Sequence, residues 1–104
     1  MFAKHIRNVD LLKHELYHFH ITEYFLRLLR QEVFRRKNII TRNEIEKLDE
    51  HCYELENDMQ DRYDEDSYHS YVLKEQKKWE RNIDSLLESL QKFSDPYVQV
   101  TSRE

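Results

Sequence analysis

The sequence predicts an all-α protein, a small helical bundle of three principal helices, and three observations favour this fold class. The chain has 104 residues with no glycine and a single proline, so the residues that build tight β-turns are nearly absent. Apolar residues recur at helical intervals along most of the chain. Two polar stretches, near residues 38–41 and 64–67, interrupt this pattern and predict corners between helices.

The domain organisation follows from the same pattern. We expect a single helical domain over residues 1–94, and Asp95-Pro96 to separate it from a C-terminal extended tail over residues 95–104. The second and third helices are expected to pack as an antiparallel hairpin. The first helix is then expected to cover both of them.

The first helix is expected to run from about residue 10 to residue 37 and carries two apolar lines. Thr22 is its weakest helical position, so a kink near residues 20–22 is one alternative. One line consists of Leu12, Leu16, Phe19, Leu26 and Val33. The other line consists of Tyr17, Ile21, Tyr24, Phe25, Leu28 and Leu29. Such a broad apolar surface is typical of a helix that packs against two neighbours.

The corner between the first and second helices has a capping signature. Thr41 followed three residues later by Glu44 is a capping box, and Ile40 and Ile45 have the spacing of a hydrophobic staple. Asn38 is a residue type that tolerates the left-handed conformation at the end of a helix. These residues therefore predict a helix start at residue 42.

The second and third helices each show one apolar seam. The second helix is expected from residue 42 to about residue 63, and the third from about residue 68 to residue 93, with Asp66 or Ser67 as its cap. The seam of the second helix, with coiled-coil spacing, is Ile45, Leu48, Cys52, Leu55 and Met59. The seam of the third helix is Val72, Gln76, Trp79, Ile83, Leu86, Leu90 and Phe93.

Charge and cysteine content indicate the compartment and the class of partner. The net charge of −4 favours neither nucleic acid nor a membrane surface as partner. The single cysteine, Cys52, rules out a disulfide within the chain and suits a reducing compartment. The sequence has no apolar run of membrane-spanning length and no signal-peptide pattern. We therefore expect a cytoplasmic protein without a cofactor.

The motif His14-Glu15-Leu16-Tyr17-His18 matches the H-E-x-x-H pattern, in which two histidines on one helical face bind zinc. The third histidine and the glycine of the longer metalloprotease motif are missing, so we expect no catalysis. An alternative metal site combines two short motifs, Glu15-x-x-His18 and Asp66-x-x-His69, as in di-iron helical bundles. The metal hypothesis, zinc or di-iron, thus depends on His14, Glu15 and His18.

A basic region over residues 27–42 suggests a second alternative, a factor associated with nucleic acid. The following helix is acidic, however, and basic residues in the last turn of a helix also complement its dipole. Aromatic and basic residues near the two corners are instead our candidates for binding a protein partner, since Tyr and Trp are favoured at interfaces. These candidates are Tyr63, Tyr68, Tyr71, Trp79, Arg35, Arg36 and Lys37.

The leading functional hypothesis is a small non-enzymatic interaction or regulatory protein. It is expected to bind a protein partner through helical faces and to form a homodimer, because slender charged helices with a narrow core are often completed by a second copy. The metal-binding protein and the nucleic-acid-associated factor are the alternatives.

Overall fold

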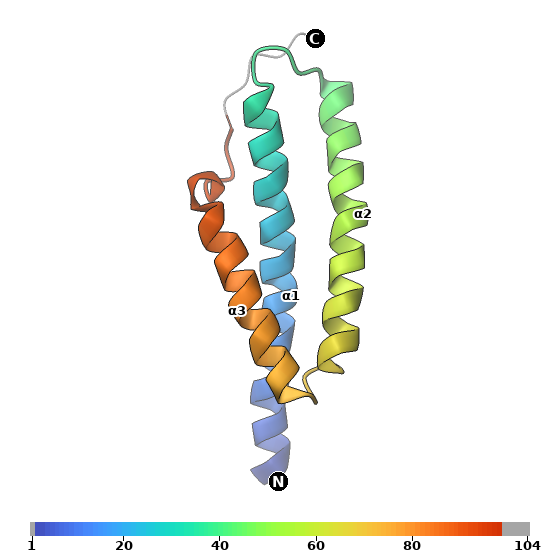
Figure 1. The fold of residues 1–104 in the computed structure, drawn as a ribbon, viewed down its shortest axis with the longest axis vertical. Helices are drawn as coiled ribbons and strands as arrows, with labels where there is room; N and C mark the ends of the chain where they lie inside the picture. The colour runs from blue at the N-terminus through green and yellow to red at the C-terminus, as the bar shows by residue number, and fades with distance from the viewer. Residues whose placement is uncertain (1, 99–104) are drawn as a thin grey trace.

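Three helices and one short 3₁₀ helix make up the fold. They are α1 (Phe2–Arg35), α2 (Arg42–Ser67), α3 (Leu73–Ser89) and η1 (Gln91–Phe93) (Figure 1). The computed structural model describes residues 2–98, and side chains from Asp10 onwards. The predicted all-α bundle of three helices is confirmed, and its overall extents of 58 × 23 × 21 Å make it elongated.

The helix α1 is the central element, because both α2 and α3 pack against it. The buried core consists of Tyr17, Ile21, Phe25, Met59, Tyr63 and Ile83. Its α1 members belong to the second of the two apolar lines expected on that helix. Most of the first line faces solvent, and the exposed fractions of its side chains are 69% for Leu12, 48% for Leu16, 72% for Phe19 and 40% for Leu26. The expected packing of α1 against two neighbours is confirmed, but most of the first apolar line takes no part in it.

The corner between α1 and α2 forms as its capping signature predicts. The Thr41 hydroxyl oxygen accepts a hydrogen bond from the backbone N–H of Glu44 at 3.2 Å, and Ile40 is only 1% exposed. Asn38 is not left-handed, because the only described non-glycine residues with positive φ are 68–70. The chain instead turns through backbone bonds from residues 39 and 40 to the carbonyl of Arg36.

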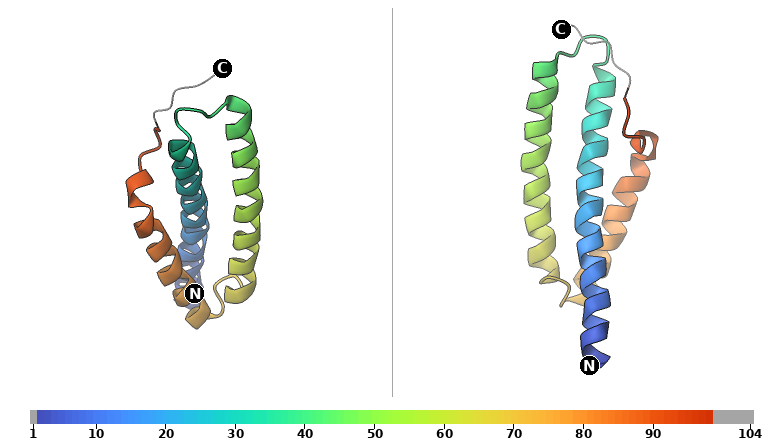
Figure 2. Two further views of the ribbon diagram at one scale, coloured as in Figure 1. Left: turned by 45° about the horizontal axis from the view of Figure 1, so that its top comes forward. Right: turned by 180° about the vertical axis from the view of Figure 1, so that it is seen from behind.

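The α1 helix is one continuous element, and its ribbon runs without a visible kink (Figure 1, Figure 2), so the alternative of a kink near residues 20–22 is not supported. The hydroxyl of Thr22 donates 2.8 Å to the carboxylate of Glu56 on α2 and 3.3 Å to the carbonyl of His18. The bond to Glu56 directs the hydroxyl toward α2, so it competes less for the backbone groups of its own helix.

The corner between α2 and α3 lies later than expected, at residues 68–72. Ser67 does not cap α3 but ends α2, where its hydroxyl donates 2.7 Å to the carbonyl of Tyr63. Tyr68, His69 and Ser70 then take positive φ angles of 49°, 55° and 83°. Backbone bonds hold this corner, including one of 2.9 Å from the amide of Val72 to the carbonyl of Ser67.

The C-terminal part of α3 is shorter than expected. The helix ends at Ser89 and a 3₁₀ turn carries the chain to Phe93. Of the tail expected at 95–104, residues 95–98 are described and form neither helix nor strand. Residues 99–104 lie outside the described part of the chain. None of the helices within that part is long and apolar enough to span a membrane.

An ionic clamp fixes the end of α3 to α1. The carboxylate of Glu23 accepts bonds of 2.7 Å from Arg27 and 3.0 Å from Arg30. These arginines also donate to the carbonyls of Leu87 and Phe93, at 2.6 and 2.8 Å, and so satisfy carbonyls at and beyond the end of α3. Partial burial acts to raise the pKa of Glu23, but the two arginines outweigh it, so this pKa is lowered.

Replacing Glu23→Gln should lower the free energy of unfolding by roughly 1.5–3 kcal/mol at neutral pH, the range for hydrogen bonds to charged groups. Because the folded-state pKa is lowered, the contribution of Glu23 is present above the unfolded pKa of about 4.3 and is lost as the pH falls through the folded value. Urea denaturation at several pH values measures both effects.

Glu54→Gln, on the exposed surface of α2, is the control and should leave stability almost unchanged. Equal stability of the two variants at neutral pH would contradict the clamp.

Candidate metal centre

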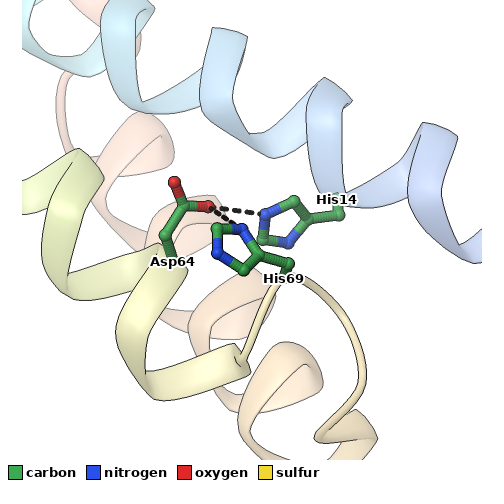
Figure 3. Close-up of side chains that lie close together, drawn as sticks. All are labelled: His14, Asp64 and His69. Carbon is green, nitrogen blue, oxygen red and sulfur yellow. Dashed lines mark hydrogen bonds and ion pairs between the residues drawn. The ribbon is translucent and has the colours of Figure 1, made fainter.

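Three histidines converge on one carboxylate oxygen where the α2–α3 corner meets α1. The Nε2 atoms of His14 and His18, both on α1, lie 2.8 and 2.7 Å from Oδ1 of Asp64 on α2. The Nδ1 atom of His69, from the corner, lies 3.5 Å from the same oxygen (Figure 3). His14 is 0% exposed, His18 and Asp64 are half-buried, and His69 is exposed. Three imidazoles, two from α1 and one from the corner, thus surround one carboxylate oxygen of α2.

Gln76 on α3 determines which nitrogen of His14 carries a proton. Its Oε1 atom lies 2.8 Å from Nδ1 of His14, and its NH₂ group donates to the Tyr63 hydroxyl at 2.7 Å and to the Glu80 carboxylate at 2.9 Å. Tyr63 uses its own hydrogen to donate 2.9 Å to the carbonyl of His14, so its oxygen is an acceptor for Gln76. Flipping the amide would break both donor bonds. The Nδ1 atom of His14 is therefore a donor, and Nε2 faces Asp64.

Gln60 on α2 likewise determines which nitrogen of His18 carries a proton. Its Oε1 atom is hydrogen-bonded to Nδ1 of His18. Its NH₂ group donates 2.9 Å to the carbonyl of His18 and 3.2 Å to the hydroxyl of Thr22. The carbonyl can only accept, which fixes the orientation of this amide too. Both histidines thus carry a proton on Nδ1 and direct Nε2 toward Asp64.

Two chemical species can occupy the space between the Nε2 atoms and Asp64. If each Nε2 carries a proton, both imidazoles are doubly protonated and positively charged beside a single carboxylate. If a metal is bound, each Nε2 instead offers a lone pair as a ligand. Ligand atoms of His14, Asp64 and His69 lie within 4.8 Å of one another, as do those of His14, Glu15 and His18.

The electrostatics favour an ionised carboxylate at this point. Partial burial acts to raise the pKa of Asp64, but hydrogen bonds and positive charge from His14 and His18 outweigh it, so the net pKa is lowered. The ring of Tyr63 stacks on His14 with centroids 4.4 Å apart. Burial raises the pKa of Tyr63, which keeps its hydroxyl protonated and bonded to the α1 backbone.

The sequence motif identified two members of this cluster and missed a third. His14 and His18 lie together as the H-E-x-x-H spacing predicts. Glu15 is exposed, although one of its oxygens is near both histidines. Asp64 was not singled out, because it lies in an acidic run and no spacing rule links it to histidines on another helix.

The alternative di-iron pairing of two short motifs is not formed. Asp66 accepts a bond of 3.0 Å from the indole nitrogen of Trp79 and belongs to no potential ligand group among the described residues. His69, the other end of that motif, joins His14 and Asp64 instead. The reason is the late corner, which places residue 69 beyond the helix.

The aromatic candidates for partner binding separate into buried and exposed residues. Tyr63 is 0% exposed and is a core residue, so its assignment to a partner surface is corrected. Tyr68 and Tyr71 are 66% and 60% exposed, with their rings edge-to-face at 6.1 Å. Trp79 is half-buried. The exposed pair lies beside the histidine cluster, on the corner that carries His69.

The basic candidates are mostly engaged within the chain. Arg35 and Arg36 form ion pairs with Glu32 at 3.1 and 3.8 Å. The ammonium group of Lys37 lies 4.4 Å from the centre of the Phe34 ring. These contacts hold the side chains near the end of α1, where they also complement its dipole.

Cys52 has the properties of a structural cysteine. It is half-buried on α2, and burial together with nearby carboxylates raises the pKa of its thiol. A thiol that stays protonated is a poor nucleophile and a poor metal ligand.

Comparison with known proteins gives no family for this chain. No protein-family model, no curated protein and no solved structure matches it.

Proposed function

We propose that this chain is a small non-enzymatic helical protein that binds one Zn²⁺ ion through His14, His18, Asp64 and His69. One observation carries the proposal: two glutamine amides of fixed orientation hold both α1 histidines with Nε2 directed at the same carboxylate oxygen. Metal-binding histidines characteristically donate their other ring N–H to an oxygen, which fixes the tautomer. Gln76 and Gln60 supply these oxygens.

The distances from the three histidine nitrogens to Oδ1 of Asp64 bracket the spacing between neighbouring ligand atoms in a zinc site. In a tetrahedral zinc site with bonds of about 2.0–2.1 Å, neighbouring ligand atoms lie about 3.3 Å apart. The three nitrogens lie 2.7, 2.8 and 3.5 Å from Oδ1 of Asp64. Binding a metal there requires the Nε2 atoms of His14 and His18 to move outward from Oδ1 of Asp64.

Zinc fits this ligand set, and a structural role fits the number of ligands. Imidazole nitrogens suit Zn²⁺, and a single carboxylate can complete the set. A site with four protein ligands has no open position for a substrate, as is typical of structural zinc. His69 is the decisive residue, because two histidines and a carboxylate alone would leave open positions like those of iron enzymes.

The metal would add to the polar bonds of Gln60, Gln76 and Tyr63 that already join the helices at this end of the bundle. His14 and His18 belong to α1, Asp64 to α2 and His69 to the α2–α3 corner. That corner holds three successive non-glycine residues at positive φ, each of which costs free energy. A bond from the metal to His69 would offset part of this cost.

We also propose that a protein partner binds to the surface beside the metal centre. Tyr68 and Tyr71 are exposed aromatic side chains of the kind favoured at interfaces. They line an open hollow of about 630 Å³ with Asp61, Asp64, Glu65 and His69. We do not propose nucleic-acid binding, because Arg27 and Arg30 of the basic region are bonded to Glu23 and to backbone carbonyls.

The first prediction is a metal content of one zinc per chain, measured by elemental analysis after purification in zinc-containing buffer. Zinc at about 100 times its dissociation constant should stabilise the fold by about 2.7 kcal/mol through mass action. His18→Ala should abolish both effects.

His51→Ala, at an exposed position on α2, is the matched control and should bind zinc like the natural chain. A purified protein that contains no metal, and whose melting temperature does not respond to zinc, would refute the proposal. The histidines would then be joined to Asp64 by hydrogen bonds alone.

The second prediction concerns the glutamine that orients His18. Gln60→Met removes the oxygen that holds the proton on Nδ1, so zinc affinity should fall by about 10- to 100-fold. Competition with a chromophoric chelator measures this affinity. Gln91→Met, at an exposed position near the end of the chain, should have no effect, and equal affinities for both variants would show that Gln60 does not orient a ligand.

The third prediction concerns His69 and the coordination number. Cobalt(II) in place of zinc should give the strong visible absorption of a tetrahedral site. In His69→Ala this absorption should weaken as water replaces the imidazole and the coordination number rises. An unchanged spectrum would remove His69 from the ligand set.

A further inference from the structure

The open hollow at the end of α2 combines carboxylates with aromatic rings. It lies where α2 passes into the α2–α3 corner, at one end of the bundle (Figure 2). Its volume of about 630 Å³ is within the usual range of ligand pockets. Three of the six residues that line it are acidic and two are tyrosines. This combination suits a cation, because both carboxylates and ring faces attract positive charge.

We infer that the protein partner proposed for this surface inserts an arginine side chain into the hollow. Its guanidinium group would donate hydrogen bonds to the carboxylates of Asp61 and Glu65 and stack on a tyrosine ring. This inference rests on the partner surface proposed above, whose binding chemistry it names, and it does not require the metal.

The carboxylates of Asp61 and Glu65 are available to a partner. Asp64, the third acidic residue of the hollow, is already bonded to His14 and His18. Within the described part of the chain, no hydrogen bond or ion pair involves the carboxylate of Asp61 or of Glu65. Both residues are exposed. They lie four positions apart and therefore on one face of α2, so one guanidinium group can reach both carboxylates.

The charges at this end of α2 oppose the dipole of the helix. The helix carries eleven acidic and three basic side chains, a formal charge of −8, and none of the basic ones is in its last turn. The carbonyl end of a helix favours cations, yet residues 64–66 there are all acidic. Asp64 is bonded to histidines, and Asp66 accepts a bond from the indole of Trp79. A cation from a partner would compensate the remaining charge, that of Glu65.

The two tyrosines favour arginine as that cation. Tyr68 and Tyr71 are 66% and 60% exposed, and their ring centroids lie 6.1 Å apart at an interplanar angle of 65°. Tyr68 follows Glu65 by three positions, so a group bound to this carboxylate lies close to the ring. The planar guanidinium group can stack on an aromatic face while its N–H groups bind carboxylates, whereas the ammonium group of lysine has no such plane.

Calorimetric titration of the full chain with a short synthetic peptide of alternating arginine and serine residues tests the inference. The peptide should bind at physiological ionic strength. The double variant Asp61→Asn, Glu65→Gln should weaken binding by about 10-fold or more, because charge-assisted hydrogen bonds are lost. Tyr68→Leu keeps an apolar side chain but removes the ring, and should weaken binding by about threefold or more.

The matched control is the double variant Glu46→Gln, Asp49→Asn, which removes the same charge from exposed positions near the other end of α2. It should leave the affinity almost unchanged, since salt screens charges that are more than about 8 Å apart. Failure of the arginine peptide to bind, or equal weakening by the two double variants, would overturn the inference.

Two further peptides separate arginine from other occupants. A lysine–serine peptide should bind about threefold or more weakly than the arginine peptide, and equal affinities would overturn the choice of arginine. If a glutamate–serine peptide, rather than the arginine peptide, shifts the NMR signals of Tyr68 and Tyr71, the partner surface stands and the inference falls. Titrations with zinc and with chelator, and separate measurement of zinc content, keep failure of the metal proposal distinguishable.

Discussion

The contact between the buried imidazole of His14 and the carboxylate of Asp64 is the interaction on which one end of the bundle depends. An imidazole removed from water needs partners for both nitrogens. Here α2 supplies the carboxylate and α3 supplies the amide oxygen of Gln76, at 2.8 Å each. The Tyr63 ring covers one face of the imidazole. All three helices are therefore positioned around His14, and the α2–α3 corner brings His69 to the same point.

Local features of the fold were predictable, whereas features that depend on packing were not. Thr41 and Glu44 define the start of α2 because the cap involves only neighbouring residues. The α2–α3 corner was placed too early, since no glycine marks it and residues 68–70 adopt left-handed conformations that their sequence does not favour. The two apolar lines of α1 are equivalent in the sequence. Only the position of α2 and α3 decides that Ile21 is buried and Phe19 exposed.

In the candidate site too, local features were predictable and features that depend on helix packing were not. His14 and His18 share a helical face, so their spacing alone predicts that they lie together. Asp64, Gln60 and Gln76 meet them only through the register of α2 and α3 against α1, which no short motif encodes. A buried glutamine on an apolar seam was the one available signal, because Gln76 occupies a position where an aliphatic side chain would otherwise pack.

X-ray absorption spectroscopy of the zinc-loaded protein identifies the atoms that bind the metal. If His14, His18, Asp64 and His69 are the ligands, the spectrum should show four nitrogen or oxygen neighbours at about 2.0–2.1 Å, with the outer-shell scattering of imidazole rings and no sulfur neighbour. A zinc–sulfur distance of about 2.3 Å would instead assign the metal to Cys52. Six light neighbours without imidazole scattering would show that zinc binds to surface carboxylates. Either result would contradict the assignment of His14, His18, Asp64 and His69 as the ligands.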